Sequence, residues 1–329
     1  MNVVARLARR LLRAADNACA ALSPGLLPKA GSLVGVNFHA LYADRAEMEN
    51  LSLAPNQDMT VEDLRRFLAL MLQSGWQAVS AQQVDQGLPP GGHYLLLTFD
   101  DGYFNHTRAL AVLEQFHAPG LFFISSRHVV EGKGFWWDAL ARELRLRGAS
   151  DDEVETEIAR MKIGQHEQIE QALRVRFGRD ALKPRGDLDR PLAPDELRDF
   201  SRHRWVSIGN HTRDHAILPN CTPQEMKLQI EGCQADLAAI TGHRPLAIAY
   251  PNGDYSRETV QAARAAGLRL GWTVRPCANR LMPRDSDSAR MTLGRHHVWG
   301  GEDVALQCRK IRAGFIPGHL LKSLMMSAY

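Results

Sequence analysis

An unbroken apolar run at residues 94–99 (YLLLTF) constrains the fold of this chain more than any other feature. A β-prone stretch without polar interruptions is typical of a buried strand in an α/β protein. Asp100, Asp101 and Gly102 follow it immediately. Functional residues of α/β folds gather at the carboxyl ends of strands. The two carboxylates therefore have two interpretations, a metal ligand beside a catalytic base or a cap at the start of the next helix.

Apolar segments alternate with helical patterns along most of the chain. Strands are predicted at residues 33–38, 76–79, 94–99, 120–124, 205–208, 246–250 and 268–274. Helices are predicted at residues 61–74, where Thr60 is the expected N-cap, and at 107–116. This alternation predicts a parallel sheet in an α/β fold, arranged as an open or distorted (β/α) barrel.

The chain of 329 residues is long enough for one large barrel or two ordinary domains. Between residues 137 and 204 the pattern becomes helical and rich in charge, without a clear strand. We interpret this segment as a helical insertion within a barrel that covers residues 31–329. Residues 1–30 form a separate N-terminal segment and linker.

The N-terminal segment has the pattern of a basic amphipathic helix. Its apolar residues alternate with Arg6, Arg9, Arg10 and Arg13 at helical spacing. The two interpretations are a surface helix packed on the domain and a helix that docks on an anionic membrane. The arginines interrupt any signal-peptide core, and no run approaches ~20 apolar residues. The sequence therefore predicts a cytoplasmic protein, soluble or peripheral on the inner membrane. The net charge of +3 gives no argument for a nucleic-acid partner.

Two histidines, His211 and His215, follow the predicted strand at residues 205–208. Their spacing of i and i+4 predicts that they share one face of a helical turn, so that both imidazoles can reach the same metal ion. Strand ends of a barrel converge, so these histidines and the Asp100–Asp101 pair are expected at one rim. Two histidines and one aspartate leave coordination positions open for water and substrate. A third cluster, residues 250–255 (YPNGDY), closes another apolar strand with a tight turn.

Together these clusters resemble the motifs of the polysaccharide deacetylases of carbohydrate esterase family 4, which share the NodB-homology domain. Residues 98–102 match the family's TFDDG motif, and residues 211–215 match its H-[ST]-x-x-H motif. Residues 250–253 resemble its YPYG-type motif, with Asn252 in place of the second tyrosine. The resemblance covers about residues 32–298 apart from the insertion. It implies a distorted (β/α)7-type barrel.

The resemblance also implies a division of roles at the site. Asp101, His211 and His215 would bind a divalent metal, with Zn²⁺ as the expected ion, and Asp100 would be the general base. Water made acidic by the ion would give its proton to Asp100 and attack an amide carbonyl. Substrate and oxyanion contacts would come from Tyr250, Pro251 and Asn252, with a backbone N–H of this turn facing the oxyanion.

The chain departs from the family pattern in two places. Ala249 stands where the family carries an arginine that orients the base, so the tuning of Asp100 must come from elsewhere. The family's late Leu-x-His motif supplies a general acid, but His296 and His297 do not have that spacing from Leu293. We predict His297 as the acid, with His296 and His39 as secondary candidates. For all three, a histidine satisfied within the core is the alternative.

Trp137, beside Trp136, is a further secondary candidate as a sugar-stacking surface, with core packing as the alternative. The sequence as a whole predicts a metal-dependent N-deacetylase of an N-acetylated polysaccharide or lipid-linked glycan precursor, such as one made for an exopolysaccharide. Two rivals are a hydrolase of another C–N bond, as in the imide- or allantoin-cleaving relatives, and a carbohydrate-binding relative without catalysis.

Overall fold

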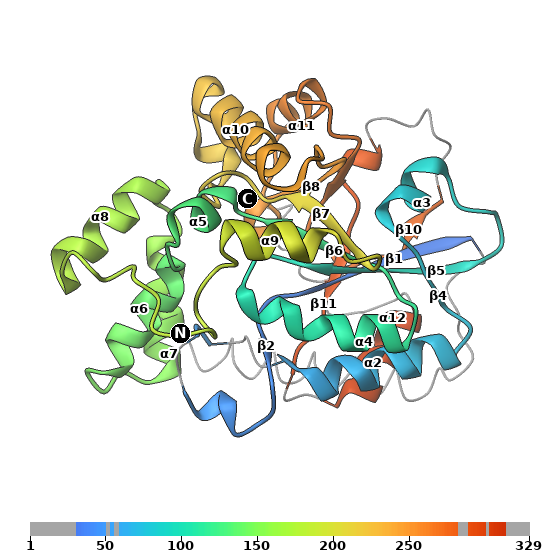
Figure 1. Cartoon of the computed structure of the whole chain (residues 1–329), viewed down its shortest axis with the longest axis horizontal. Coiled ribbons are helices and arrows are strands. Elements are labelled where there is room, and N and C mark those ends of the chain that lie inside the picture. Colours follow the sequence, from blue (N-terminus) through green and yellow to red (C-terminus); the bar gives the residue numbers. More distant parts are fainter. Residues whose placement is uncertain (1–30, 51–52, 56–58, 282–288, 301–302, 314–329) are drawn as a thin grey trace, which may run out of the picture.

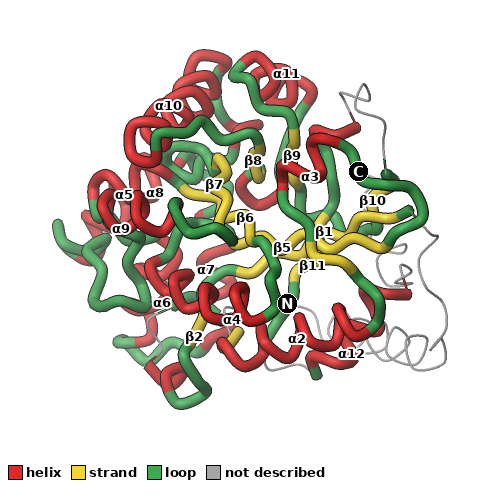
Figure 2. The backbone as a smooth tube through the Cα atoms, turned by 45° about the vertical axis from the view of Figure 1, so that its right-hand side comes forward, coloured by secondary structure: helices red, strands yellow, loops and turns green. Residues whose placement is uncertain are grey.

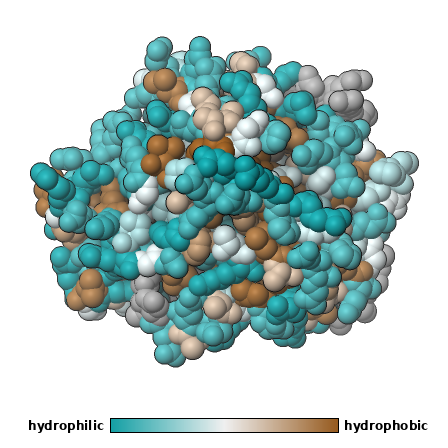
Figure 3. Space-filling view, viewed as in Figure 1, coloured by the Kyte–Doolittle hydropathy of each residue, from teal (hydrophilic) through white to brown (hydrophobic). Residues whose placement is uncertain are grey.

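The fold was analysed in a computed structural model that describes residues 31–50, 53–55, 59–281, 289–300 and 303–313 (Figure 1). The predicted N-terminal helix lies outside these residues. Within the described part of the chain, no helix has the length and apolar character needed to cross a membrane. Hydrophilic side chains cover most of the face seen in Figure 3, and apolar ones are scattered among them.

Parallel strands form a nearly closed barrel, which confirms the predicted distorted (β/α)7 fold. Neighbouring strands follow the order β1-β5-β6-β7-β8-β9, and β11 pairs with the free side of β1. Leu293 closes the gap, because its N–H donates to the Gly271 carbonyl and its carbonyl accepts from the Thr273 N–H, each over 2.8 Å. In the described chain the barrel strands are β1 (Ser32–Phe38), β5 (His93–Phe99), β6 (Gly120–Ile124), β7 (Val206–Asn210), β8 (Ala247–Ala249), β9 (Leu270–Trp272) and β11 (Arg295–His297).

Short strands and helical turns complete the strand layer. The strand β4 extends the sheet beside β5, β10 runs antiparallel to β1, and β2 pairs with β3 in a separate ribbon. Their bounds are β2 (Leu41–Tyr42), β3 (Met59–Thr60), β4 (Gln77–Ala78) and β10 (Asn279–Arg280). The 3-10 turns are η1 (Glu47–Asn50), η2 (Phe104–Arg108), η3 (Leu218–Asn220), η4 (Pro251–Gly253) and η5 (Ala289–Met291).

Helices surround the strands, as Figure 2 shows. The side chains of Val36, Leu97 and Phe122 point outward and join a core with helices α2, α4 and α12. As predicted, Thr60 caps α2, where its hydroxyl accepts from the Asp63 N–H over 3.1 Å. The surrounding helices are α2 (Val61–Gln73), α3 (Ala81–Gln86), α4 (Ala109–Gln115), α5 (Ser126–Glu131), α10 (Pro223–Thr241), α11 (Arg257–Ala265) and α12 (Val304–Ala313).

The barrel interior is apolar at its lower layers and polar at the carboxyl rim. Inward side chains such as Leu96, Phe123 and Trp272 fill the lower layers. Gly35 on β1 faces the same interior, where a Cβ atom would lie only 2.8 Å from the Trp272 ring and 2.9 Å from the side chain of Arg295. The missing side chain at Gly35 therefore makes the room in which Arg295 lies.

A group of helices lies between β6 and β7, where the insertion was predicted. They are α6 (Trp136–Arg145), α7 (Asp151–Met161), α8 (His166–Phe177) and α9 (Pro194–Ser201). The first three lie together at one side of the barrel (Figure 1). Leu140, Val154 and Leu173 share a core of their own there. That residues 137–204 are an insertion within the barrel, rather than an independent domain, stays a prediction.

The strand predictions differ from the structure mainly at the ends. The predicted segments 246–250 and 268–274 shorten to β8 and β9, and the predicted helix 107–116 divides into η2 and α4. The strand β11 was not predicted at all. Its three residues, Arg295 to His297, are all polar, so they carry none of the apolar pattern by which a buried strand is recognised.

Candidate metal centre and catalytic pair

Asp101, His211 and His215 come together at the carboxyl rim of the barrel. The Nε2 atoms of His211 and His215 each lie 3.4 Å from Oδ1 of Asp101. One ligand atom from each residue lies within 4.8 Å of the other two. Asp101 Oδ1 is buried and has no hydrogen-bond partner among the described residues. A buried carboxylate oxygen that faces two imidazole nitrogens at this spacing fits a divalent cation.

Backbone geometry aims these side chains at one point. Asp100 and His211 continue the inward-facing side of β5 and β7, while Asp101 has a φ of 82° that turns its side chain toward the histidines. The prediction that His211 and His215 share a helical turn is wrong. Thr212 and His215 have φ values of 61° and 52°, so the segment is a loop that curls back on itself. Asn210 stabilises the curl, because its Oδ1 accepts from the Thr212 N–H over 2.9 Å.

Hydrogen bonds and charges set the protonation of the candidate ligands. Nδ1 of His211 donates to the Ala249 carbonyl over 2.8 Å, which leaves the lone pair of Nε2 facing Asp101. Burial, followed by the charge of His211, lowers the pKa of His215 to about 3. Burial would raise the pKa of Asp101, but the interactions with His211 and His215 outweigh it and hold that pKa low. An ionised carboxylate and a neutral imidazole are the forms that ligate metals.

Burial would lower the pKa of His211, but Asp101 and Asp100 outweigh that effect and raise it. At a pH below this raised pKa, a cation that binds at the candidate centre displaces a proton from His211, so we expect its affinity to rise with pH in that range.

Asp100 has an arginine partner after all. Arg295 donates from Nη1 to Oδ1 over 2.6 Å and from Nη2 to Oδ2 over 2.8 Å, while both side chains are buried. The guanidinium also donates to the hydroxyl of Thr98 and to the carbonyl of Thr273. The sequence predicted that the tuning of Asp100 must come from a residue other than the one at position 249, and Arg295 occupies that role in the structure.

The paired guanidinium keeps Asp100 ionised. Burial is the largest influence and by itself would raise the pKa of Asp100. The charge of Arg295, the charge of His211 and the hydrogen bonds from Arg295 together outweigh it and hold the pKa below the ordinary value. The bidentate contact also fixes the carboxylate plane.

Sequence reasoning missed Arg295 because it stands next to two histidines that drew attention as candidate acids. One signal was present: an arginine in a late polar segment of a chain whose usual arginine is absent. The pairing of β11 with β1, which sets Asn37 opposite His297, brings Arg295 into the barrel interior.

Of the three candidate acids, His297 and His39 lie at the rim beside Asp100. Their ring centroids are 5.0 Å apart, and Nδ1 of His297 lies 3.1 Å from Nδ2, the side-chain amide nitrogen of Asn37. If Asn37 donates in this contact, a neutral His297 carries its proton on Nε2. Burial and then the charge of His39 lower the pKa of His297 well below its usual value. Strand alternation points the buried His296 to the opposite face of β11.

The residues of the third cluster divide between core and rim. The Tyr250 side chain lies on the outer face of β8, where its hydroxyl donates to the Met291 carbonyl over 3.0 Å. Tyr250 can therefore contribute to the site through its backbone and not through its side chain. Asn252 has a φ of 57° in the turn that begins at Pro251. Asn252 and Tyr255 line a cavity of about 520 Å³ together with Lys162 and Ile163 of the inserted segment.

Trp137 contacts the candidate metal centre through the ring of His215. Its ring lies edge-to-face on His215 at 4.6 Å between centroids, and its Nε1 donates to the Tyr103 hydroxyl over 3.0 Å. The side chain is 8% exposed, and Trp136 is 7% exposed. These contacts agree with the packing interpretation and leave little surface for a sugar.

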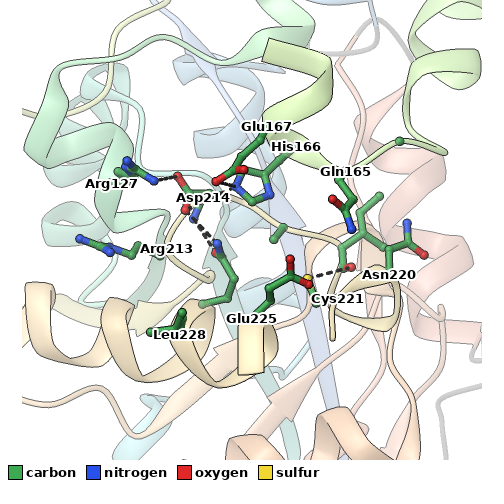
Figure 4. Close-up of a pocket in the computed structure, with 14 residues that line it drawn as sticks. Arg127, Gln165, His166, Glu167, Arg213, Asp214, Asn220, Cys221, Glu225 and Leu228 are labelled. Carbon is green, nitrogen blue, oxygen red and sulfur yellow. Dashed lines mark hydrogen bonds and ion pairs between the residues drawn. The ribbon is translucent and has the colours of Figure 1, made fainter. Parts of the chain in front are cut away.

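Asp214 joins the histidine loop to the inserted helices (Figure 4). Its carboxylate accepts from Gln229 over 2.8 Å and lies 3.4 Å from Arg127 and 3.6 Å from His166 of α8. These residues line a cavity of about 150 Å³. Because Asp214 is buried and adjacent to His215, its contact with His166 lets the inserted helix α8 brace the loop that carries this candidate ligand.

Comparison with known families and structures agrees with the fold. The sequence model of the family described as polysaccharide deacetylase matches residues 88–271, more than half of the chain. Over 87 residues the chain is 30% identical to YxkH of Bacillus subtilis (strain 168), whose name places it among the polysaccharide deacetylases. That match covers 26% of this chain and 31% of YxkH, so the chain spans about a third of the relative's length.

Two solved structures share the architecture. The Streptococcus pyogenes deacetylase PplD in complex with acetate aligns with a TM-score of 0.57 at 15% identity, over 86% of this chain and 99% of PplD. IcaB from Ammonifex degensii aligns with a TM-score of 0.56 at 18% identity, over 87% of this chain and 99% of IcaB. At these identities the likeness is one of fold.

Proposed function

Because this chain belongs to the polysaccharide deacetylase family, whose members hydrolyse non-peptide C–N bonds, we propose that it is a metal-dependent N-deacetylase of N-acetylated glycans. The observation that carries the proposal is the division of labour between two adjacent buried carboxylates. Asp101 faces His211 and His215, whereas Asp100 is held by Arg295. In the proposed organisation, residues 31–329 form the catalytic barrel, residues 137–204 are an insertion within it, and residues 1–30 precede it.

Asp101, His211 and His215 are the proposed ligands, with Zn²⁺ as the proposed ion since two imidazoles and one carboxylate suit it. When bound, a divalent cation here supplies Lewis acidity, which acidifies water and polarises an amide carbonyl. Asp100 is the proposed base that takes the proton from the attacking water. Its support is that it is ionised, oriented and adjacent to Asp101.

Departure of the amine and stabilisation of the oxyanion are assigned to groups at the carboxyl rim of the barrel. The amide carbon–nitrogen bond breaks as the amine leaves. The amine takes up the proton that Asp100 removed from the water, and His297 is the proposed group that delivers it. The N–H of Asn252 is the proposed donor to the oxyanion, since this role needs the backbone and tolerates the asparagine side chain. A lipid-linked precursor as the substrate stays a prediction from the sequence.

Acetate release tests the proposal. The full-length chain is incubated with Zn²⁺, Co²⁺ or a chelator and with a panel of N-acetylated hexosamine oligosaccharides and their monosaccharide. Metal-dependent release of acetate is the expected result. Hydrolysis of cyclic imides without acetate release would favour the rival C–N hydrolase. Sugar binding without release under any condition would favour a carbohydrate-binding relative.

The His211→Ala variant is expected to lose most of its bound metal. Removing one of three ligands eliminates a coordination bond and leaves Asp101 and His215 unable to enclose the ion. Metal content per chain, measured by mass spectrometry after dialysis, checks this. The exposed His243 provides a matched control, because His243→Ala should keep the metal content of the wild type. Equal metal content in both variants would contradict the ligand assignment.

Membrane contact is proposed for the basic N-terminal segment, on the spacing of its arginines. The full-length chain is expected to cosediment with phosphatidylglycerol vesicles more than with phosphatidylcholine vesicles. A chain that lacks residues 1–28 is expected to lose this difference. Unchanged sedimentation of the shortened chain would remove the support for peripheral membrane contact. Cytoplasmic location stays a prediction.

A further inference from the structure

An exposed tryptophan, Trp299, stands beside His297, the proposed acid, and has no part in the proposed chemistry. It follows β11 by two residues, so it lies at the carboxyl rim. Its side chain is 37% exposed. Four other tryptophans, at positions 76, 136, 137 and 272, are at most 8% exposed, and Trp205 is half-buried. A large aromatic ring that stays exposed at the mouth of a site is typical of a binding surface rather than of core packing.

The backbone of Trp299 is held by the side chain of Gln307. The backbone N–H of Trp299 donates to Oε1 of Gln307 over 2.9 Å, and the backbone carbonyl of Trp299 accepts from Nε2 of the same glutamine over 2.6 Å. Gln307 is buried on α12, and Val304 and Cys308 of that helix belong to the main core. The backbone of this exposed residue is therefore fixed to the core, as a binding surface requires.

The indole continues a row of rings that leads to Asp100. The ring centroids of Trp299 and His297 are 3.7 Å apart, and those of His297 and His39 are 5.0 Å apart. The carboxylate of Asp100 is close enough to affect the pKa of His297. A molecule that lies on the exposed part of the indole thus has one edge next to the group that would protonate a leaving amine.

We propose that Trp299 is the platform on which the N-acetylated hexosamine ring of the substrate stacks. This inference deepens the proposed function and rests on it for the identity of the sugar. Aromatic faces bind the C–H faces of sugar rings by dispersion and apolar burial, while the hydroxyl groups at the ring edge stay hydrated. The platform orients the amide between His297 and Asp100. It also replaces Trp137, the candidate stacking residue that packs behind His215.

Kinetics separate a platform from a packing role. The Trp299→Ala variant is expected to raise KM by about tenfold, the equivalent of one stacking contact, with kcat changed less than about twofold. Trp299→Phe should retain part of the affinity. If Trp299 only holds His297 in place, kcat falls and KM does not move, which would overturn the proposal.

Fluorescence gives a second readout that does not need turnover. The full-length chain, with and without Zn²⁺, is titrated with N-acetylglucosamine and its β-1,4- and β-1,6-linked tetrasaccharides. A change in tryptophan emission is expected for the wild type and for Trp205→Phe, because Trp205 precedes β7 at the opposite end of the barrel. Trp299→Phe should lose it. Circular dichroism confirms that each variant is folded.

The outcomes distinguish the two proposals. Emission changes that depend on Trp299, without acetate release from any sugar, would keep the platform and reject the deacetylase. Acetate release with unchanged KM and emission in the Trp299 variants would keep the deacetylase and reject the platform. Absence of an emission change with every sugar in the wild type would also reject the platform.

Discussion

Replacing Asp100 with asparagine is expected to lower kcat by about 100- to 10,000-fold, the usual contribution of a general base. The substitution preserves the shape of the side chain but removes its ability to take a proton from water. Bound metal should remain, because the proposed ligand atoms belong to Asp101, His211 and His215 and not to Asp100. Steady-state kinetics of acetate release and metal content per chain measure the two effects separately.

A matched control for this variant is Asp195→Asn, since Asp195 is an exposed residue at the start of α9. It should keep the wild-type kcat. Full hydrolysis by Asp100→Asn would show that the base is assigned wrongly. Loss of metal together with activity would show that Asp100 contributes to the metal centre itself.

Replacing Arg295 with methionine is expected to lower the free energy of unfolding by about 3–5 kcal/mol at neutral pH. The change leaves the carboxylate of Asp100 buried without its partner, while the methionine still fills much of the volume beside Gly35. Urea denaturation measures the loss. Arg269→Met is the control, because Arg269 is half-exposed and its partner Asp85 keeps a second arginine, Arg290.

The reason for the loss can be tested in the background of Asp100→Asn. In that background the buried side chain at position 100 carries no charge. Arg295→Met should therefore lower the free energy of unfolding clearly less than it does in the wild type. An equal cost in both backgrounds would show that Arg295 stabilises the barrel through packing and its bonds to Thr98 and Thr273.

Arg295→Met should also change the pH dependence of catalysis. The folded-state pKa of Asp100 lies below its ordinary value, so the stabilisation from this pair is present above the ordinary carboxylate pKa and is lost as pH falls. Without the guanidinium, burial raises that pKa, and the base becomes protonated at a higher pH. The acidic limb of the kcat/KM profile is therefore expected to move to higher pH. An unmoved limb would contradict the tuning role.

The architecture was largely predictable because its signals are local. The apolar run at residues 94–99 and the capped helix after Thr60 follow from side-chain patterns within a few residues. The positions of β6 and β7 were found in the same way. The order of the two metal motifs after strands also predicted that Asp101, His211 and His215 would share a rim.

The geometry within the site was less predictable. The spacing of His211 and His215 suggested a helical turn, but the hydrogen bonds that the side chains of Asn210 and Thr212 accept from backbone N–H groups favour a curled loop with positive φ. Such bonds compete with helix formation and depend on neighbouring elements. The packing of Trp137 against His215 depends equally on how the inserted helices lie against the barrel.

By itself the sequence determined which side chains could do the chemistry: two carboxylates after a buried strand and two histidines after another. Only the tertiary structure decided how Asp100 is held. Its partner, Arg295, is 195 positions away, on a strand without an apolar pattern. Barrel closure sets β11 against β1, and Gly35 leaves the space for the guanidinium. The physical reason is that a buried charge requires a partner in space, and the folding of the whole barrel determines which residue is near.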